Sequence, residues 1–495
     1  MSKEIVEVGG GGLAKPRIKV LSDEEILEIH WRSLSILSKV GVKVDHKEAL
    51  ELLKSIGSEV NLNSRVAKIP EYIVKEALDK TPNIVRLYYR DGKRFIELYG
   101  DNTYFDVGSA AYYYMDYKTN EIRRPVSRDL AEVAKVADFL PNTHIMSTAL
   151  VPSDVPEIIA DRWRMYIVTK NCTKPIDTGA FTLEGIPDAV KIMASIIGEE
   201  NVSKKPFMIF AACPSPPLKW SELTTQNLMD CAKYGIPAHI IPMPQTGGTS
   251  PATLAGSIVQ SNAEVLAGLV IAQFTKPGSP VVYSGSPTVF DQRFATSCTG
   301  YIEVGLISAA FSQLAKFYNI PSAAYTMVSD SKTVDLQSAI ESSLGALISV
   351  LSGINMAIGS GMLLEENCIS LIKLVIDDDI AGSTLRFAKG VHVDVDTLAE
   401  EVIREAGPGG LFLKHKHTRE WWRKEHYIPR LFDKRTYDMW RKLGSKDLNT
   451  VAKENIEKIL KEHTVEPLPQ DIEKELNETM KNIAHKYGIK KLPEI

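Results

Sequence analysis

The sequence lacks three features: an uninterrupted apolar run of 18 residues, an excess of basic residues and a secretion signal. A transmembrane helix needs about 20 mainly apolar residues, so no membrane-spanning helix is expected. The net charge is −4 and the pI is about 6.3, whereas binders of nucleic acid or anionic membranes usually carry a basic excess. The opening residues, MSKEIVEVGGGGLAKPR, contain no apolar stretch of the kind that directs secretion. We therefore expect a cytoplasmic protein that binds neither nucleic acid nor membrane.

Metal and nucleotide motifs are also missing. The cysteines are odd in number and form no CxxC pair, which argues against a disulfide framework and against a zinc site; they are Cys172, Cys213, Cys231, Cys298 and Cys368. The histidines form no HExxH motif, and the glycines form neither GxGxxG nor GxxxxGK[ST]. His415 and His417 lie two residues apart in LKHKH, a spacing that suits a solvated or interface pair better than a metal site. No metal bound by this chain is expected.

A regular succession of short apolar runs fills the middle of the chain. With 495 residues the chain could form several domains or one large barrel with extensions. The runs begin about 30 to 43 residues apart and lie at 102–108, 144–150, 174–179, 206–213, 236–243, 279–285, 320–327 and 354–361. Segments of helical character separate several of them, among them 127–140, 219–235, 251–276 and 301–319. Apolar runs with little alternation are typical of parallel strands buried on both faces.

Eight such units predict an α/β fold, a (β/α)8 TIM-type barrel, with its functional groups at the carboxyl ends of the strands. The alternative is an open doubly wound sheet. That fold more often carries a glycine-rich phosphate loop after its first strand, and this chain has none.

Helical extensions are expected on both sides of the barrel. The GGGG stretch predicts a flexible arm over residues 1–15. Ser22 followed by Glu25 forms a capping-box pattern that should begin a helix ending at Gly41. Further helices are expected near 47–56 and 70–80. The predicted division is an N-terminal helical extension (1–95), the barrel (96–390) and a C-terminal helical extension (391–495).

The C-terminal extension is rich in charge and in aromatic residues, namely Trp421, Trp422, Tyr427 and Trp440. Aromatic side chains among Arg and Lys can bind nucleic acid, but the acidic chain as a whole favours packing against the barrel or a neighbouring subunit. A homo-oligomer is expected.

The residues just after the eight runs include few groups suited to proton transfer; they are Gly108, Ser109, Ala149, Thr178, Cys213, Gln245, Ser284, Ser286, Met327 and Gly359. Enzymes that move protons need carboxylates, His or Lys with adjusted pKa values. We therefore expect a substrate whose reaction requires little proton transfer.

Aromatic residues lie in or beside several runs: Tyr104, Phe105, Tyr112, Tyr113, Tyr114, Phe210, Tyr283, Phe290 and Tyr325. Aromatic faces attract a quaternary ammonium by roughly 0.5–2 kcal/mol per contact, although barrel aromatics also fill the interior. Arg293, in SGSPTVFDQRF, could clamp a carboxylate through two parallel hydrogen bonds. Its alternative is a surface ion pair with Asp291.

Several longer stretches carry a family resemblance: CPSPPL at 213–218, TGGTSP at 246–251, SNAEVLAGLVIAQFTKPGSPVVYSG at 261–285, FD at 290–291, GLISAAFSQLAKFYNIPS at 305–322, SDSK at 329–332, GSGML at 359–363, LVIDDDI at 374–380, GSKDL at 444–448, and the N-terminal pattern LSDEEILEIH…KIPEYIVKEAL. With these stretches the chain resembles the trimethylamine methyltransferase family, corrinoid-dependent methylamine methyltransferases with a (β/α)8 barrel. The resemblance covers nearly the whole chain.

One departure from the family pattern is informative. The trimethylamine enzymes carry pyrrolysine in the strand that reads IPSAAYTMVSD here, and the flanking residues assign that position to Val328. Valine can form no covalent adduct with an amine. The chain therefore resembles the non-pyrrolysine branch, whose characterised members demethylate quaternary amines such as glycine betaine.

The resemblance implies methyl transfer to Co(I) of a corrinoid (cobalamin). No DxHxxG motif for cobalamin is present, so the cofactor is expected on a cognate corrinoid protein. A quaternary ammonium leaves as a neutral tertiary amine with no proton to supply. The enzyme then has mainly to position the N-methyl group and exclude water.

The resulting hypothesis assigns roles to seven residues. Arg293 anchors a carboxylate, with Gln292 as an alternative polar partner. Tyr104, Tyr112 and Phe290 contact the trimethylammonium group. Gln245 and Ser286 hold polar parts of the substrate.

Other features stay open. The terminal helical segments or the glycine-rich loop at 407–410 are candidates for partner docking. Glu303 resembles a family position, with a buried carboxyl or a helix N-terminal charge as the alternative. The substrate could instead be another N-methylated compound such as proline betaine or carnitine. The rival functions are a non-catalytic binding protein for quaternary ammonium compounds and a barrel lyase or aldolase that uses Lys332 as a Schiff-base amine.

Overall fold

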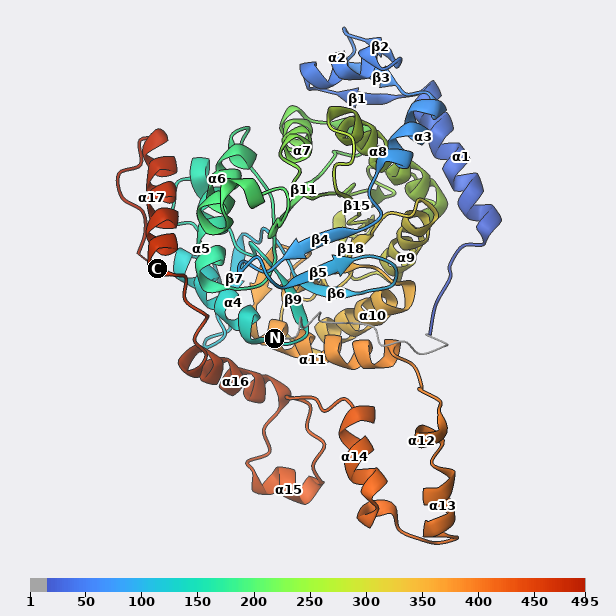
Figure 1. Ribbon diagram of the computed structural model, residues 1–495, viewed down its shortest axis with the longest axis vertical. Coiled ribbons are helices and arrows are strands. Elements are labelled where there is room, and N and C mark those ends of the chain that lie inside the picture. Colours follow the sequence, from blue (N-terminus) through green and yellow to red (C-terminus); the bar gives the residue numbers. More distant parts are fainter. Residues whose placement is uncertain (1–15, 495) are drawn as a thin grey trace.

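The computed structural model describes residues 16–494, so the flexible arm predicted for residues 1–15 lies outside the described residues. Eight parallel strands form the centre of the molecule in the order β15-β13-β11-β10-β9-β6-β19-β18 (Figure 1). They are β6 (Tyr104–Val107), β9 (Thr143–Ser147), β10 (Ile176–Thr178), β11 (Met208–Ala212), β13 (Ala238–Ile240), β15 (Val281–Tyr283), β18 (Ala323–Tyr325) and β19 (Met356–Ser360). The amide of Tyr283 donates to the carbonyl of Pro321 over 2.8 Å and links β15 to the β18 segment. The strands thus close into a barrel.

One helix follows each barrel strand: α4 (Ser127–Phe139), α5 (Ala160–Asn171), α6 (Gly185–Ile197), α7 (Glu222–Tyr234), α8 (Leu254–Thr275), α9 (Ile302–Phe317), α10 (Leu336–Ser352) and α11 (Leu371–Ala388). Single-turn 3-10 helices precede α5 and follow α6, at η1 (Glu157–Ile159) and η2 (Glu199–Asn201). The predicted TIM-type barrel is confirmed: seven of the eight apolar runs contain one of its strands, and the run at 144–150 overlaps β9, which begins one residue earlier.

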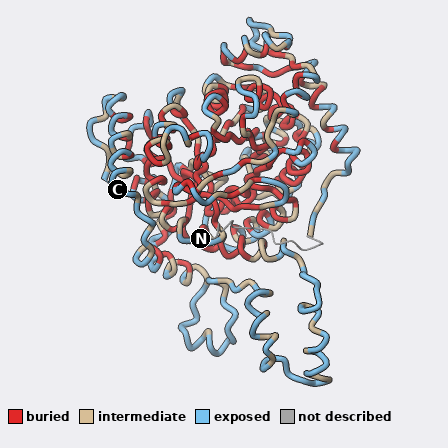
Figure 2. Tube along the Cα trace, viewed as in Figure 1, coloured by how far each residue is buried: buried red, intermediate tan, exposed pale blue. Residues whose placement is uncertain are grey.

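Burial on both faces explains the strand composition. The barrel strands are almost continuously buried, whereas exposed residues gather on the outer helices and the extensions (Figure 2). Among the described residues, α8 is the one helix long and apolar enough to cross a membrane. Of its most apolar stretch of 18 residues, 78% is buried inside the protein. A helix that is apolar on all sides belongs in a protein core or a membrane. Here α8 is a core helix.

The N-terminal segment contains the expected helices and also short strands. Ser22 caps α1 (Asp23–Lys39) in a capping box with Glu25, as predicted, and Gly41 follows the helix with a φ of 81°. The other helices are α2 (Lys47–Ser55) and α3 (Glu71–Lys80). Strands β1 (Val42–Val44), β2 (Glu59–Asn61) and β3 (Val66–Lys68) join β12 (Lys219–Trp220) in a small sheet, and β4 (Val85–Tyr88) pairs with β5 (Phe95–Leu98). Strands of three or four residues are too short for a period-two pattern, so the sequence did not reveal them.

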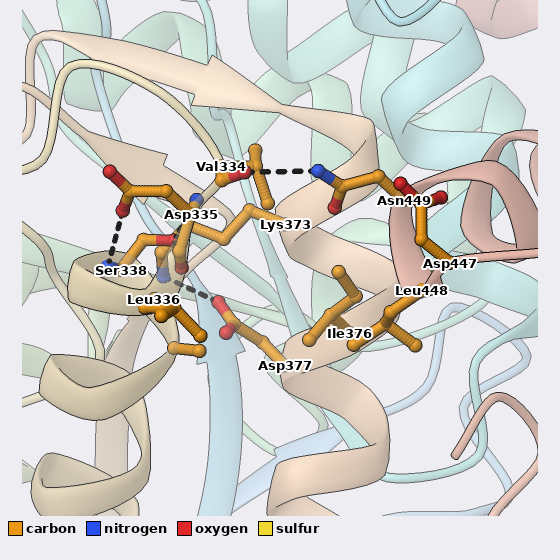
Figure 3. A pocket seen from close by; sticks show the side chains of 11 residues that line it. Val334, Asp335, Leu336, Ser338, Lys373, Ile376, Asp377, Asp447, Leu448 and Asn449 are labelled. Carbon is orange, nitrogen blue, oxygen red and sulfur yellow. Dashed lines mark hydrogen bonds and ion pairs between the residues drawn. The ribbon is translucent and has the colours of Figure 1, made fainter. Parts of the chain in front are cut away.

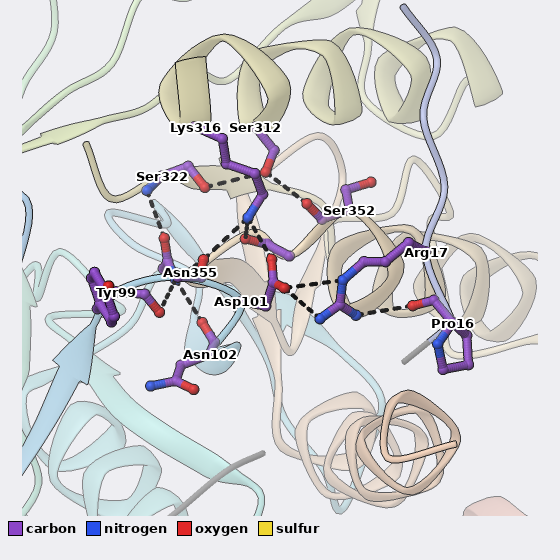
Figure 4. Close-up of polar contacts among 12 residues, drawn as sticks. Pro16, Arg17, Tyr99, Asp101, Asn102, Ser312, Lys316, Ser322, Ser352 and Asn355 are labelled. Atoms are coloured by element: carbon purple, nitrogen blue, oxygen red, sulfur yellow. Dashed lines mark hydrogen bonds and ion pairs between the residues drawn. The ribbon is translucent and has the colours of Figure 1, made fainter. Parts of the chain in front are cut away.

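Polar contacts tie the N-terminal segment to the amino end of the barrel (Figure 4). Arg17 pairs with Asp101 over 2.6 Å, and Lys316 at the end of α9 reaches the same carboxylate over 2.7 Å. Asn355, just before β19, donates to the carbonyl of Asn102 over 2.8 Å. Asp101 thus links the first described residues to the loops that precede the strands.

The C-terminal extension is helical but only partly packed. It consists of α12 (Val395–Leu398), α13 (Glu400–Ala406), η3 (Phe412–Lys414), α14 (Lys416–Glu425), α15 (Tyr437–Lys442), α16 (Leu448–Glu462) and α17 (Gln470–Lys486). Helix α16 lies against α11 and α4, and α17 lies against α6. Residues 391–446, called the C-terminal arm below, project from the body in Figure 1, and Leu431 is the one buried residue among them. The division of the chain at residues 95 and 390 stays a prediction.

Candidate active site at the carboxyl end of the barrel

Two small sheets cover the carboxyl ends of the barrel strands, a region called the mouth below. One sheet consists of β7 (Tyr113–Met115), β8 (Ile122–Arg123), β20 (Met362–Leu363) and β21 (Cys368–Ser370). The other consists of β14 (Gln245–Thr246), β16 (Thr288–Asp291) and β17 (Thr296–Cys298). These sheets are built from the loops that follow β6, β13, β15 and β19. In TIM barrels this end carries the functional groups.

A cluster of acidic residues and one histidine lies inside the barrel. The hydroxyl of Ser147 on β9 donates to Asp106 on β6 over 3.0 Å, and Nε2 of His239 on β13 lies 2.9 Å from Oδ1 of Asp177 on β10. All four side chains are buried. Burial, reinforced by the charge of Asp177, holds the pKa of Asp106 well above its usual range.

Three buried atoms of this cluster accept or donate no hydrogen bond among the described residues while both acids are ionised: Oδ2 of Asp106, Oδ2 of Asp177 and Nδ1 of His239. The raised pKa of Asp106 favours its protonated form, which can hydrogen-bond to Asp177, so Nδ1 of His239 is the atom that this pairing leaves without a partner in the described part of the chain. Buried polar atoms in native proteins are nearly always paired. This nitrogen therefore indicates a place where water or a bound molecule completes the hydrogen bonding.

The cluster corrects the expectation of few proton-transfer groups. That expectation considered the residues just after each run, whereas Asp106, Asp177 and His239 lie within the runs YFDVG, PIDTG and IPAHIIPM. A strand points alternate side chains to opposite faces. A polar residue inside an otherwise apolar strand was the signal that could have found them.

Glu366 adds a further carboxyl at the mouth. It accepts a hydrogen bond from Ser286 over 2.9 Å, and burial raises its pKa to about 7. Leu364, Glu365 and Glu366 all have positive φ angles, between 53° and 75°. Consecutive left-handed residues that are not glycine cost energy and tend to occur at functional sites.

Cys213 and Tyr325 lie close to these acids. Burial raises the pKa of the Cys213 thiol to about 12, and the charges of Glu366 and Asp177 act in the same direction. The pKa of Tyr325 rises for the same reasons, with burial as the main cause. Cys213 and Glu366 nevertheless keep some accessible surface. Cys213, Tyr325, Asp177 and Glu366 are close enough for their charges to act on one another in the desolvated interior of the barrel.

Four of the predicted residues, Gln245, Ser286, Phe290 and Gln292, lie at the mouth. Gln245 on β14 is paired in register with Thr288 on β16, the strand that also carries Phe290. A methyl group on Gly248 would lie 3.2 Å from Oε1 of Gln245 and 3.4 Å from Cβ of Phe290. The TGG loop therefore packs beside both side chains.

Arg293 forms the surface ion pair with Asp291 that the sequence offered as the alternative to a substrate contact. Its guanidinium pairs with Asp291 over 2.7 Å and donates to the Tyr301 hydroxyl over 2.9 Å, with the side chain 72% exposed. The hydrogen bonds from Arg293 and Tyr301 hold the pKa of Asp291 well below its usual range. A carboxylate would have to compete with Asp291, so the structure lends the predicted anchor no support.

Tyr104 and Tyr112, the two tyrosines predicted to contact the trimethylammonium group, lie apart from the interior cluster. Tyr104 is the first residue of β6, at the amino end of the barrel, where its ring lies 5.4 Å from that of His144. This position is opposite to the mouth, which corrects the expectation of a substrate contact. Tyr112 lies in the mouth loop after β6, 48% exposed, with the Arg124 guanidinium 5.3 Å from its ring.

Val328 lies three residues after the end of β18 and is buried. It borders a cavity of about 460 Å³ between α9 and α10. Lys332 is exposed, and its ammonium donates to the carbonyl of Asp330 over 2.6 Å. Glu303 is half-buried in the first turn of α9, a position that favours the helix N-terminal charge.

The histidine pair faces two different partners. Nδ1 of His415 lies 3.7 Å from Glu405, and Nε2 of His417 lies 3.0 Å from the carbonyl of Asp396. Within residues 16–494 no group of three or more His, Cys, Asp and Glu side chains could hold a metal ion.

A second cavity, of about 380 Å³, lies between α10, α11 and the start of α16 (Figure 3). Its one lysine, Lys373, contacts Asp377 over 2.6 Å (Figure 3). The same ammonium contacts the Ser342 hydroxyl over 2.7 Å and the carbonyl of Met327 over 2.9 Å. These contacts hold α11 against α10 and against the segment that follows β18.

Comparison with solved structures supports the fold. The monomethylamine methyltransferase MtmB of Methanosarcina barkeri matches over 94% of both chains with a TM-score of 0.50 and 11% identity. The structure is thus that of a TIM-like barrel related in shape to an amine methyltransferase.

Comparison of sequences shows the family. The model of the trimethylamine methyltransferase (MTTB) family matches residues 12–487. The trimethylamine methyltransferase MttB of Methanosarcina thermophila is 35% identical over 96% of this chain and 100% of its own. A glycine betaine methyltransferase of Desulfitobacterium hafniense is 33% identical over 87% of this chain and 90% of its own. The chain belongs to the trimethylamine methyltransferase (MTTB) family and is a methyltransferase for methylamines or quaternary amines.

Proposed function

We propose that this protein transfers a methyl group from a quaternary amine of the glycine betaine type to Co(I) of a corrinoid carried by a cognate partner protein. The observation that carries the proposal is Val328, at the position that the family resemblance assigns to pyrrolysine. A chain without that residue has no covalent means of activating a neutral amine, whereas a quaternary ammonium needs none. A cytoplasmic location is part of the proposal.

The acidic interior supports a cationic substrate. Asp106, Asp177 and Glu366 bring carboxyl groups to a desolvated space, and Tyr325 adds an aromatic ring. Attraction between a cation and a carboxylate is much stronger away from water. The positive charge disappears from nitrogen as the methyl group leaves, so excessive ground-state binding would slow the reaction. A carboxyl with a pKa of about 7, such as Glu366, binds a cation moderately.

The chain's own task is to hold and orient the substrate. The C–N bond breaks with its electron pair on nitrogen, and a neutral tertiary amine departs without a proton. When bound, the partner's reduced corrinoid supplies the nucleophile that accepts the methyl group. The mouth sheets exclude water and aim the N-methyl group outward, toward the side from which the partner must come.

The proposal is tested by methyl transfer to cobalamin. The protein is incubated with Co(I) cobalamin and a panel of glycine betaine, proline betaine, carnitine, choline and trimethylamine, and methylcobalamin is followed by its absorbance. We expect transfer from betaines and none from trimethylamine. The cognate corrinoid protein should give faster transfer than free cobalamin, because docking orients the cobalt.

Two outcomes would count against it. Transfer from trimethylamine alone would show that Val328 does not decide the substrate. Binding of quaternary amines without any transfer, even with the partner, would favour the non-catalytic binding protein instead.

A further inference from the structure

Arg164 is a buried cation without a counter-ion. It lies near the start of α5, at the end of that helix nearest the mouth, and its side chain is fully buried. Its Nε donates to the carbonyl of Thr148 over 2.8 Å, and Nη2 contacts the same carbonyl and lies 3.3 Å from the Ser109 hydroxyl. Nη1 has no partner, and no carboxylate of the described residues lies within ion-pair distance.

Arg162, two residues earlier on the same helix, shows what a structural arginine looks like here. It is equally buried, and its Nε likewise has no hydrogen-bond partner within residues 16–494, but it pairs with Asp161 over 2.7 Å and lies 3.6 Å from Asp188. The ion pairs are therefore what distinguishes Arg162 from Arg164. A buried charge without a partner is costly. The fold places two acids beside Arg162 and none of the described acids within ion-pair distance of Arg164. Arg164 is therefore available to bind an anion from outside the protein.

The surroundings of Arg164 connect it to the acidic interior. Burial lowers the pKa of Arg164 to about 10, so the guanidinium remains charged at neutral pH. The charges of Asp161, Tyr112, Asp177 and Tyr325 act in the opposite direction, and Asp161, the first of them, pairs with Arg162 and forms no ion pair with Arg164. The ring of Phe181 lies 5.0 Å from the guanidinium. Contacts to Thr148 orient the guanidinium plane and leave Nη1 available.

We propose that Arg164 binds the carboxylate of the substrate, with Nη1 and the Ser109 hydroxyl as donors, in the role that the sequence had suggested for Arg293. This inference rests on the proposed function and narrows it to zwitterionic amines, whose onium group faces Asp177, Glu366 and Tyr325 while their carboxylate faces Arg164. A hydrogen bond from a charged guanidinium to a carboxylate is roughly twice as strong as one between neutral groups, and the Ser109 hydroxyl supplies a second donor beside it. Cations without a carboxylate gain nothing from it.

The test measures binding by calorimetry on the full-length protein without its partner. The probes are glycine betaine, its uncharged-head analogue 3,3-dimethylbutyrate, and choline, which lacks a carboxylate. Arg164→Met should weaken binding of both carboxylate probes by about tenfold or more, equal to at least about 1.4 kcal/mol, and leave choline unchanged. Arg164→Lys should give an intermediate loss, because lysine keeps the positive charge but lacks the planar guanidinium that binds Thr148 and directs Nη1 at the same time. Arg293→Ala is the matched control and should change neither carboxylate probe.

Unchanged betaine affinity in Arg164→Met, a wild-type protein that binds neither carboxylate probe, or a loss of carboxylate binding only in Arg293→Ala would overturn the inference. If the Arg164 variants do not fold, a crystal structure of the wild-type protein with 3,3-dimethylbutyrate decides: the carboxylate lies on Arg164 or the proposal is wrong.

Failure of the proposed function is distinguishable. Carboxylate binding lost in Arg164→Met, together with no methyl transfer from any quaternary amine, leaves the anion site standing and removes only the proposed reaction. Methyl transfer from betaines with full binding in Arg164→Met removes only the anion site.

Discussion

Individual side chains of opposite charge divide the mouth into two regions. Asp177 and Glu366 are buried acids near the carboxyl end of the barrel, and Arg164 is a buried cation without an ion pair in the described part of the chain. An isolated buried ion is costly. If Arg164 binds the substrate as proposed, a zwitterion would offset both charges at once.

The pH dependence of cation binding should follow Glu366. Burial raises the pKa of this carboxyl to about 7, so it is neutral in acid and becomes charged as pH rises through 7. Choline binding, measured by calorimetry, should therefore strengthen between pH 6 and pH 8, by about fivefold to tenfold if ionisation of this group controls it. In Glu366→Gln the affinity should be weaker and nearly constant over this range. A similar slope in the variant would assign the dependence to another group.

The contribution of Glu366 to the free energy of unfolding should decrease as pH rises, whereas choline binding should strengthen. A carboxyl whose pKa is raised in the folded state favours folding below its unfolded pKa, near 4.5, and this contribution is lost as pH rises through about 7. Glu366→Gln should thus gain stability relative to the wild type at pH 8 and lose that advantage at pH 4. Urea unfolding at both pH values measures the difference, and an advantage confined to pH 4 would contradict this sign.

At the scale of secondary-structure elements, close approaches between helices and strands shape the barrel. Gly345 in α10 lies where a methyl group would come within 1.6 Å of the carbonyl oxygen of Thr326, at the end of β18. No rotamer change relieves a collision with backbone. Glycine at this position lets α10 lie against the strand segment that leads to Val328.

Gly345→Ala should therefore destabilise the protein, although alanine favours helices by about 1 kcal/mol. We expect a loss of about 2–4 kcal/mol, the range of overpacked core substitutions at their worst. Gly305→Ala in α9 is the matched control, because its methyl group would meet the flexible end of Ile348 instead, at 2.5 Å, and it should cost less than about 1 kcal/mol. Unfolding midpoints in urea compare the two. Equal losses would show that the backbone contact is not decisive.

At the scale of the whole molecule, the C-terminal arm is the part that the barrel leaves uncovered. Large apolar side chains along it are strongly exposed, including Leu398, Ile403, Leu411 and Leu413 at 57–73%. Helices as short as α12 and α13 are marginal without packing. Tyr427 and Arg430 bind Asp379 and Asp378 on α11, which fixes the base of the arm to the flank of the barrel.

The arm should pack against a second copy of this chain. Residues 414–446 contain eleven Lys or Arg and four Asp or Glu, whereas the chain as a whole is acidic at −4, so the remaining surface of another copy complements it in charge. Light scattering should find a homo-oligomer. Replacing Leu398, Ile403, Leu411 and Leu413 by serine should shift it toward the monomer, while Leu62→Ser, at an exposed apolar residue outside the arm, should not. A monomeric wild-type protein would contradict this.

Local pattern was sufficient to predict the architecture. Eight apolar runs at regular spacing, a capping box at Ser22 and Gly41 after the first helix all act over a few residues, so they can be found in the sequence, and the structure contains each of them. The sequence did not predict the short strands β1 to β5, because their formation depends on pairing with other segments of the chain. The resemblance of motifs was likewise sufficient for the family, which the comparisons confirm.

The sequence by itself determined the barrel and the family, because both depend on patterns and motifs in contiguous residues. Only the tertiary structure decided which charges meet. Asp106, Asp177 and His239 come together because separate strands point them inward. Arg293 forms an ion pair with Asp291, whereas Arg164 forms no ion pair among the described residues, because different side chains surround the two guanidinium groups. Electrostatics in a protein depends on distance and burial, and the order of residues along a chain specifies neither until the chain has folded.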